Sequence, residues 1–212
     1  VDVDAWDADE PETLHALNDM YLKRGLDPAE YMRSLKTIFL HRPYRRMPET
    51  GWAVSYLFAM SRGSAEDRAE LASYCYEIGI EPEALEAEML SKPDIANFAN
   101  PEQLQYEAYP LTMAVLRVFR NSRHYRREIL DKLALGSDTM LDLGNLYTAA
   151  LLAWMAAGFE QGLDEDVFTP GEEVLTLGYG SGDAAEVIPF FMADGWREAT
   201  QKIRFGDAME CA

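Results

Sequence analysis

The feature that most restricts the fold of this chain is a run, residues 147–159, that reads as a helix and is apolar on nearly all sides. A helix without a polar face has to be buried on all sides. The longest apolar runs of the sequence, residues 52–60 and 149–159, are well short of the ~20 residues that cross a bilayer. We therefore expect this helix in the interior of a protein, covered by other elements, and not in a membrane.

Short runs with the composition of β-strands accompany the buried helix. They are residues 36–40, 139–143, 173–177, 184–193 and 197–205. Helical spacing of apolar positions occurs at residues 13–23, after Asp27 and at residues 49–61, and residues 64–135 read as helical throughout. The sequence therefore predicts an α/β fold with a mixed sheet of about five strands, a buried helix, and an all-helical insertion between the first two strands.

The domain boundaries follow from the same patterns. Residues 1–12 are mostly acidic and are expected to form a loose lead-in. Residues 13–205 are expected to form one domain, in which residues 63–135 are the helical insertion. Residues 206–212 would then be a tail.

The charge of the chain disfavours one class of partner. There are 19 basic and 37 acidic residues, which gives a formal net charge of -18. A protein that binds duplex nucleic acid needs a basic face for the phosphates, so we expect no nucleic-acid partner. A small polyanionic ligand stays compatible with this charge if positive residues are concentrated locally.

The two cysteines, Cys75 and Cys211, have neither the number nor the spacing of a disulfide framework or a zinc site. Cys75 lies in a helical stretch without a glycine turn or a histidine neighbour, so we interpret it as a packing residue and not as a nucleophile. This cysteine usage fits a reducing cytosol, and no secretory signal is visible. Because the chain starts at Val1, we expect processing or a longer parent protein.

A histidine and three arginines stand at the end of the first predicted strand. His41 precedes a turn, where α/β proteins place functional groups. Its imidazole would exchange a proton at a carbonyl, and the alternative is a turn histidine hydrogen-bonded to backbone. Arg42, Arg45 and Arg46 cluster within an otherwise acidic chain, so they need an anionic partner, either surface carboxylates or a phosphorylated ligand.

Asn145 follows a predicted strand and opens the buried helix. Its amide would lie beside the positive N-terminal end of that helix. A helix N-cap is the simpler interpretation, because asparagine fills that position well, and the two interpretations are compatible. A carbonyl oxygen at this point would meet an amide donor and a partial positive charge, which are the ingredients of an oxyanion site.

A glycine-rich run, residues 178–182, follows the strand at residues 173–177. It is a weak match to a dinucleotide-binding loop, because Asp183 stands where the third glycine would be and the following residues read as a strand. A tight glycine turn that brings backbone amides close to a ligand is the better interpretation.

A second arginine-rich segment lies in the helical insertion. Its members have the three- and four-residue spacing of one helix face and are Arg117, Arg120, Arg123, His124, Arg126 and Arg127. Such a face is usually solvated and paired with local acids, and a binding surface is the second choice.

Three motifs in order carry a resemblance to a known family. They are His41-Arg42-Pro43-Tyr44, Gly144-Asn145-Leu146-Tyr147-Thr148 and Tyr179-Gly180-Ser181-Gly182. With these motifs the chain resembles the C-terminal half of hydroxymethylglutaryl-CoA synthases and of related polyketide β-branching synthases, over about residues 35–196. The resemblance implies a thiolase-like fold, in which two similar α/β halves stack five-stranded sheets around buried helices, and this chain would be the second half.

The resemblance also implies roles for residues. In that family a first-half cysteine takes an acetyl group from acetyl-CoA, a glutamate there deprotonates the acetyl methyl, and the resulting carbon attacks the ketone of acetoacetyl-CoA. His41 matches the histidine that polarises the acceptor carbonyl, and Asn145 matches the asparagine that assists it. The positions matching substrate contacts are Pro43, Tyr44, Arg46, Tyr179, Gly180 and Ser181.

Departures from the family pattern limit what this chain can do alone. Neither cysteine matches the nucleophile, and the glutamate base belongs to the first half. Arg46 stands where the family has a lysine associated with CoA phosphate, and Gly178 stands where it has a serine. The resemblance thus implies a half that binds and polarises the acceptor and is inactive by itself.

The implied substrates are acetyl-CoA and an acyl-CoA, with no further cofactor and no metal. The implied partners are the N-terminal half of the synthase and a second copy in a homodimer. One alternative is a polyketide β-branching synthase whose acceptor sits on an acyl carrier protein, which would dock on the helix face at residues 117–127. Another is a non-catalytic subunit of a split synthase.

Overall fold

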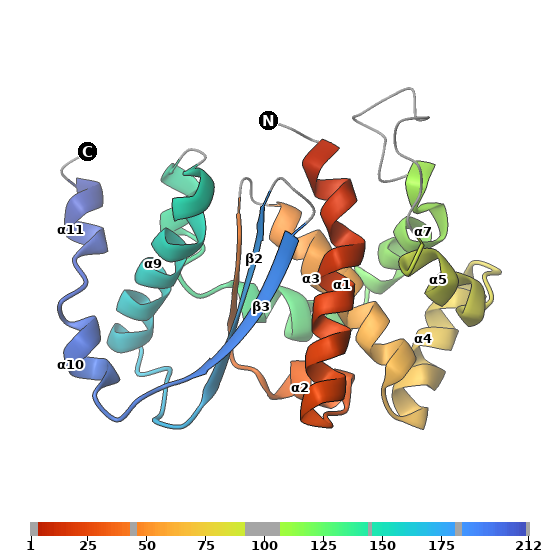
Figure 1. Cartoon of the computed structure of the whole chain (residues 1–212), viewed down its shortest axis with the longest axis horizontal. Helices are drawn as coiled ribbons and strands as arrows, with labels where there is room; N and C mark the ends of the chain where they lie inside the picture. Colours follow the sequence, from red (N-terminus) through yellow and green to blue (C-terminus); the bar gives the residue numbers. More distant parts are fainter. Residues whose placement is uncertain (1–3, 43–45, 92–106, 144–145, 181–183, 211–212) are drawn as a thin grey trace.

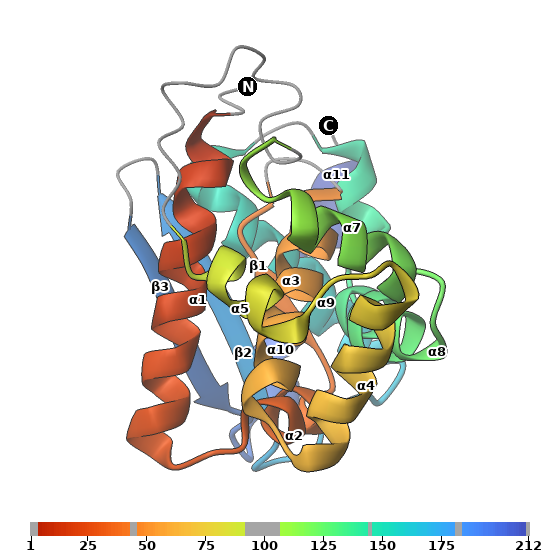
Figure 2. The same cartoon turned by 90° about the vertical axis from the view of Figure 1, so that its right-hand side faces the viewer.

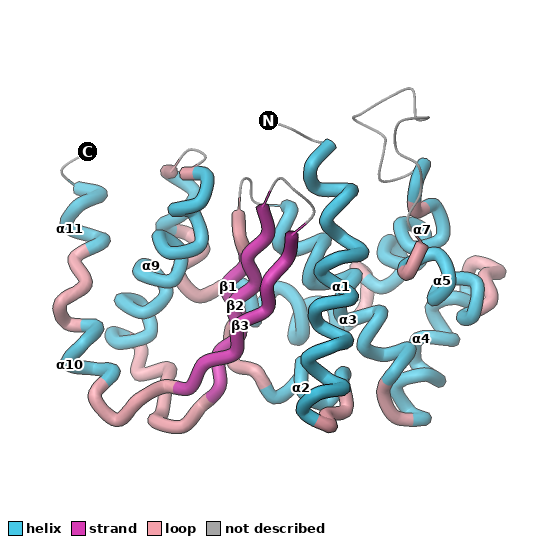
Figure 3. The backbone as a smooth tube through the Cα atoms, in the orientation of Figure 1, coloured by secondary structure: helices cyan, strands magenta, loops and turns pink. Residues whose placement is uncertain are grey.

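The computed structural model of the chain describes residues 4–42, 46–91, 107–143, 146–180 and 184–210. In this part of the chain, helices surround a small mixed sheet (Figure 1, Figure 3). The predicted α/β class is therefore confirmed. Among the described helices, none combines the length and the apolar character that crossing a bilayer requires.

The element bounds are as follows. The α-helices are α1 (Asp4–Arg24), α2 (Pro28–Ser34), α3 (Arg46–Arg62), α4 (Ala65–Glu77), α5 (Pro82–Met89), α7 (Pro110–Phe119), α8 (Arg123–Tyr125), α9 (Ala150–Asp164), α10 (Trp196–Thr200) and α11 (Phe205–Glu210). A π-helical turn is η3 (Arg126–Leu130), and the 3-10 turns are η4 (Asp131–Leu133), η5 (Thr139–Asp142) and η6 (Tyr147–Ala149). The strands are β1 (Ile38–Leu40), β2 (Glu173–Gly180) and β3 (Ala184–Phe191).

The sheet has the order β1-β2-β3. β1 pairs with β2 in parallel, with Ile38 opposite Leu175. β2 pairs with β3 in antiparallel fashion, with Glu173 opposite Phe191. The parallel pairing means that β1 and β2 end at the same edge of the sheet, which is where the chain presents His41.

Helices cover both sides of the sheet (Figure 1). On one side α9 contacts β1, and α10 and α11 pack on α9. On the other side α1 packs against β2, β3 and α3. Beyond α3, the helices α4, α5 and α7 form a further helical layer, which faces the viewer in Figure 2. The described residues between 63 and 135 that form regular structure are thus helical, as expected, whereas their place as an insertion between the first two predicted strands stays a prediction.

Aromatic rings of both layers belong to one continuous hydrophobic core. Between the sheet and α9, the ring of Phe39 meets Trp154 edge-on at 5.9 Å and Phe159 at 5.8 Å between centroids. In the helical layer, Tyr56 stacks on Phe119 at 5.9 Å. Because all of these rings except Phe159 are almost fully buried, the position of α9 against β1 depends on how the aromatic rings interlock.

Two predicted strands are wrong. Residues 139–143 form the 3-10 turn η5, and residues 197–205 hold most of α10 and the first residue of α11. Methionine and leucine in the first run, and arginine, glutamate and alanine in the second, favour helix, and neither run pairs with a described strand. The described sheet therefore has three strands and not the five that the thiolase-like half requires.

The termini are more ordered than expected. Helix α1 begins at Asp4, within the lead-in predicted at residues 1–12. Most of the tail predicted at residues 206–212 belongs to α11. The α11 backbone is anchored by a long-range contact, since the carboxylate of Glu160 accepts hydrogen bonds from the N–H groups of Phe205 at 2.8 Å and Gly206 at 2.9 Å. Composition near the ends did not indicate that contact.

The buried helix predicted at residues 147–159 is confirmed as a helix but not as fully buried. Trp154 and Ala157 are buried against the sheet side, whereas Leu152 is 66% exposed. β1 covers one side of α9, and α10 and α11 cover another, but no described element covers Leu152. The apolar face that the sequence indicated is therefore only partly covered in this chain.

Candidate functional site

The candidate site lies at the carboxyl ends of β1 and β2. His41 follows β1 directly, and its backbone N–H donates a hydrogen bond to the carbonyl of Leu177 in β2 at 2.8 Å. This bond extends the parallel ladder by one residue. The first turns of α3 and α9 lie at the same end of the molecule as these strand ends (Figure 1). A half-buried imidazole is thus held at an edge where helix N-termini and strand ends meet.

The protonation state of His41 follows from its surroundings. Burial lowers the pKa of this imidazole below its ordinary value, because the charged form loses hydration. The ring is therefore neutral at neutral pH. A neutral imidazole has one nitrogen that donates and one that accepts, so it can hold a carbonyl oxygen or exchange a proton with it.

The next residue, Arg42, points into the protein. Its side chain is buried, its Nη1 donates to the hydroxyl of Ser137 at 2.8 Å, and its guanidinium lies 5.0 Å above the ring of Trp154 in α9. A guanidinium over an indole face gains a cation–π interaction. Arg42 thus joins the end of β1 to α9 and to the turn that precedes η5.

The N-terminal end of α9 has no side-chain cap. The N-cap position is Ala149, which offers no acceptor, and the first turn holds no acidic residue. Just before it, Tyr147 has a left-handed backbone with φ of 51° and is 74% exposed. Backbone in this region is unfavourable for an aromatic residue and tends to occur at functional segments. The 3-10 turn η6 continues directly into α9, and the N–H groups of Ala149 and Ala150 donate to the carbonyls of Leu146 and Tyr147, so the positive end of the helix dipole lies at η6.

The structure describes only some of the predicted site residues. Arg46 begins α3 and is exposed, and Tyr179 and Gly180 end β2, beyond Leu177, which accepts the hydrogen bond from the His41 N–H. The remaining predicted positions lie outside the described residues and are Pro43, Tyr44, Asn145 and Ser181. The predicted convergence of His41 and Asn145 therefore stays a prediction.

Cys75 is confirmed as a packing residue. It lies in α4 and is fully buried. Burial, with smaller contributions from Glu83 and Glu81, raises the pKa of its thiol to about 11, so the thiolate is scarce at neutral pH. A thiol in this state does not act as an acyl acceptor. Cys211 lies outside the described residues.

The arginine-rich segment is not one helix face. α7 ends at Phe119, and a turn separates it from α8, whose N-terminus is capped by the hydroxyl of Ser122. The side chains of all the arginines in the segment are exposed. Arg127 pairs with Glu128, whereas Arg117, Arg123 and Arg126 form no ion pair with any described residue. The expected pairing with local acids is thus met only in part.

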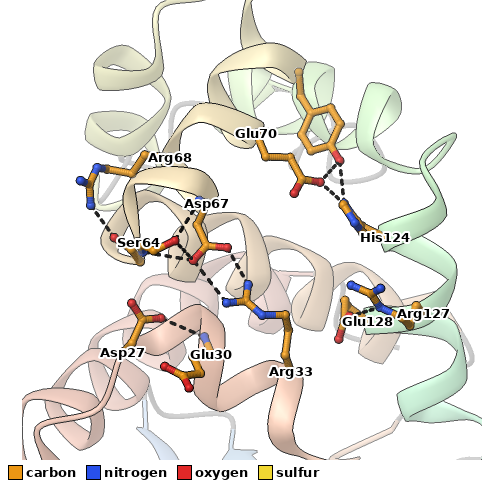
Figure 4. Close-up of polar contacts among 12 residues, drawn as sticks. Asp27, Glu30, Arg33, Ser64, Asp67, Arg68, Glu70, His124, Arg127 and Glu128 are labelled. Carbon is orange, nitrogen blue, oxygen red and sulfur yellow. Dashed lines mark hydrogen bonds and ion pairs between the residues drawn. The ribbon is translucent and has the colours of Figure 1, made fainter.

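A second polar cluster is formed by side chains of α2, α4 and α8 (Figure 4). Arg33 of α2 pairs with Asp67 of α4 at 2.6 Å, and Asp67 and Ser64 form a capping box at the start of α4. Glu70 contacts the imidazole of His124. These contacts join α2, α4 and α8, so we interpret the cluster as structural. Across the described part of the chain, no group of three or more metal-ligating side chains is arranged to hold a metal ion.

The contact between Arg42 and Ser137 was not predicted from the sequence. They are separated by 95 positions, and no local pattern joins them. The capping box at Ser64 and Asp67 had a readable signal, a serine followed three positions later by an acid at the start of a helical run.

Comparison with protein-family models and with curated proteins does not assign this chain to a family. No protein-family model matches it. A search of curated proteins also finds no match.

Proposed function

We propose that this chain is the acceptor-binding half of a condensing enzyme similar to hydroxymethylglutaryl-CoA synthase. In this proposal it binds acetoacetyl-CoA or a similar 3-ketoacyl thioester and polarises the ketone that a carbanion attacks. The enzyme as a whole would be a cytoplasmic acyltransferase that uses acetyl-CoA and an acyl-CoA and works as a homodimer. Its nucleophile and base would come from an N-terminal half.

The observation that carries the proposal is the state of His41. It is neutral at neutral pH, half-buried, and held at the carboxyl end of a parallel strand pair by the hydrogen bond to Leu177. Ligands of α/β proteins bind preferentially at this edge of the sheet. The N-terminal end of the continuous η6–α9 segment lies at the same end of the molecule, and its helix dipole would add positive potential.

The chemistry follows from these two groups. As a carbanion adds to the ketone, negative charge develops on the ketone oxygen. In this proposal the imidazole N–H and N–H groups of the helix start would donate to this oxygen without reorganisation, and one such donor contributes about 10² to 10³ in rate. Asn145 would supply a further amide donor. Arg46, exposed at the start of α3, would contact the CoA phosphates.

The buried thiol of Cys75 supports the second part of the proposal. A condensing enzyme needs a thiolate that accepts the acetyl group, and the raised pKa and full burial of Cys75 are unsuited to that role. The proposal concerns the acceptor site, and it does not depend on a complete five-stranded half, which the described residues do not form.

Calorimetric titration with acetoacetyl-CoA tests the proposal. We expect wild-type chain to bind the thioester and His41→Ala to bind it at least about tenfold more weakly, since one lost hydrogen bond corresponds to ~1.4 kcal/mol. His124→Ala is the matched control, because this histidine contacts Glu70 in the helical layer and should leave affinity unchanged. Equal affinity in wild type and His41→Ala would remove His41 from the site.

A second experiment tests the absence of the nucleophile. Incubation with labelled acetyl-CoA should leave Cys75 unmodified by mass spectrometry. Stoichiometric thioester on Cys75 would contradict the proposal, because this half would then carry its own acetyl acceptor.

One observation favours the alternative of a polyketide β-branching synthase whose acceptor is bound to a carrier protein. Arg117, Arg123 and Arg126 are exposed and form no ion pair with described residues, although the chain has 37 acidic residues. Carrier proteins are acidic, so these arginines would dock one. Binding of acetoacetyl carrier protein in preference to acetoacetyl-CoA, lost in Arg117→Glu/Arg123→Glu, would favour this alternative. A non-catalytic subunit of a split synthase is the remaining alternative, and it predicts no binding of either thioester.

A further inference from the structure

We propose that Arg42 is the positioning residue of this site: its guanidinium, held between Ser137 and the ring of Trp154, fixes the carboxyl end of β1, and with it His41, against α9. The inference rests on the proposed function, because it concerns the same acceptor site. The sequence predicts an anionic partner for Arg42, and the inference gives it a different role, through its contacts with Ser137 and Trp154.

The end of β1 needs an anchor beyond the sheet. β1 spans only Ile38–Leu40 and pairs only with β2 among the described strands. The hydrogen bond from His41 to Leu177 secures the backbone toward β2. It does not secure it toward α9, which lies on the adjacent face.

Arg42 supplies the connection toward α9. Its Nη1 lies 2.8 Å from the hydroxyl and 3.4 Å from the carbonyl oxygen of Ser137, and its guanidinium carbon lies 5.0 Å from the centre of the Trp154 ring. Three segments far apart in the sequence thus meet at one planar side chain. A guanidinium is suited to this, since it donates in its plane and stacks through its face at the same time.

Trp154 is itself fixed. Its indole N–H donates to the carbonyl of Leu135 at 2.8 Å, and its ring meets Phe39 of β1 edge-on. Phe39 thus contacts Trp154, Trp154 bonds Leu135 in the turn at residues 135–137, and Arg42 contacts both Ser137 of this turn and Trp154. These contacts form a closed network. Because Trp154 is only 1% exposed, the side chains of this network have little freedom to move.

The choice of arginine is informative. Arg42 is 7% exposed, and burying a permanent charge is unfavourable compared with an apolar side chain of similar length. An apolar side chain would pack there without that penalty, so the contacts of Arg42 with Ser137 and Trp154 help to offset it.

Two variants separate positioning from charge and from packing. Arg42→Met removes the charge and all donors and keeps an unbranched apolar stem, and Arg42→Lys keeps the charge but loses the planar face and the fork of donors. The readout is the pH titration of the His41 ring by NMR, assigned with His41→Ala. We expect the titration of His41 to move toward higher pH in both variants, because the ring becomes more hydrated when the strand end loosens.

Binding of acetoacetyl-CoA by the same variants gives a second readout, with an expected loss of about tenfold, equal to ~1.4 kcal/mol. Arg33→Met is the matched control, because it removes another arginine with a defined partner, Asp67, far along the helical layer. It should lower stability while leaving the His41 titration in place. If Arg42→Met does not fold, Ser137→Ala removes only the 2.8 Å hydrogen bond and should shift the titration in the same direction.

The outcomes are distinguishable. If Arg42→Lys leaves the His41 titration unchanged while Arg42→Met moves it, the effect is one of charge, and the positioning role is refuted. If both leave it unchanged, and Ser137→Ala does too, the role is refuted as well. If the titration moves as expected but no thioester binds to wild-type chain, positioning stands and the proposed acceptor function fails.

Discussion

The contact between α9 and β1 makes a sharp prediction about Gly158→Ala. Gly158 lies on the face of α9 toward β1, and a Cβ placed there would be 2.5 Å from Cε1 and 2.6 Å from Cζ of Phe39. Carbon atoms in contact prefer separations of about 3.5–4.0 Å. The added methyl group therefore requires a displacement of roughly 1 Å, either of the ring or of the helix.

The ring of Phe39 has nowhere to move. It is fully buried, with Trp154 at 5.9 Å and Phe159 at 5.8 Å between centroids. Overpacking of this kind costs about 1–3 kcal/mol, and two contacts against a confined ring suggest the upper part of that range. Alanine recovers about 1 kcal/mol of helix propensity relative to glycine. The net expectation is a loss of about 2 kcal/mol in the free energy of unfolding.

Urea denaturation followed by circular dichroism measures this loss. Gly178→Ala is the matched control, because Gly178 lies in β2 at the same interface, and the nearest atom to an added Cβ there is Cδ2 of Leu151 at 3.9 Å. That distance is an ordinary contact, so Gly178→Ala should be neutral or stabilising by up to about 1 kcal/mol. A Gly158→Ala chain as stable as wild type, or more stable, would refute the close approach of α9 to β1.

Further predictions concern the helical layer. Asp67→Ala should cost about 2 kcal/mol in urea denaturation, because α4 loses its cap and Arg33 its partner. Burial would raise the pKa of Asp67, but the hydrogen bonds from Arg33 and Ser64 outweigh it and hold this pKa below its ordinary value. Asp67 therefore contributes its full stability above the carboxyl pKa of the unfolded chain, and this contribution is lost as pH falls through the lowered pKa of the folded chain. The free energy of unfolding of Asp67→Ala should therefore fall less steeply toward acid pH than that of wild type. Cys75, fully buried with its thiol pKa raised to about 11, should stay unlabelled by a thiol reagent in the folded chain at neutral pH and react after denaturation, as peptide mapping can show. Glu88→Ala should destabilise the chain by about 1 kcal/mol in thermal unfolding. The reason is that the Glu88 carboxylate accepts hydrogen bonds from the backbone N–H groups of Leu111 at 2.9 Å and Thr112 at 2.6 Å, at the start of α7. An unchanged melting temperature would contradict this capping role.

Several elements could be predicted because their signals are local. The strand at residues 36–40 and the helix at residues 49–61 correspond to β1 and α3, since short β-rich runs and apolar periodicity depend on neighbouring residues alone. The interpretation of Cys75 as a packing residue held for the same reason, because its helical surroundings are visible in the sequence. The position of His41 after a strand was also predictable from the strand itself.

The wrong strands show where local signals fail. Residues 139–143 and 197–205 contain residues that are compatible with either state, and a strand forms only where an edge is available to pair with. Pairing partners are distant in sequence, so five strands were expected where the described chain forms three. The break at Arg120 to Ser122 was missed likewise, because spacing of arginines alone does not report a turn.

By itself, the sequence determined the α/β class of the protein, the strands β1, β2 and β3, the helix α9 and the placement of a histidine where a strand ends. Only the tertiary structure decided how far α9 is covered, that Arg42 meets Ser137 and Trp154, and that burial lowers the pKa of His41. Helix and strand patterns arise from the order of residues along the chain. Burial and pKa depend on which distant segments come together, and one sequence read position by position does not contain that information.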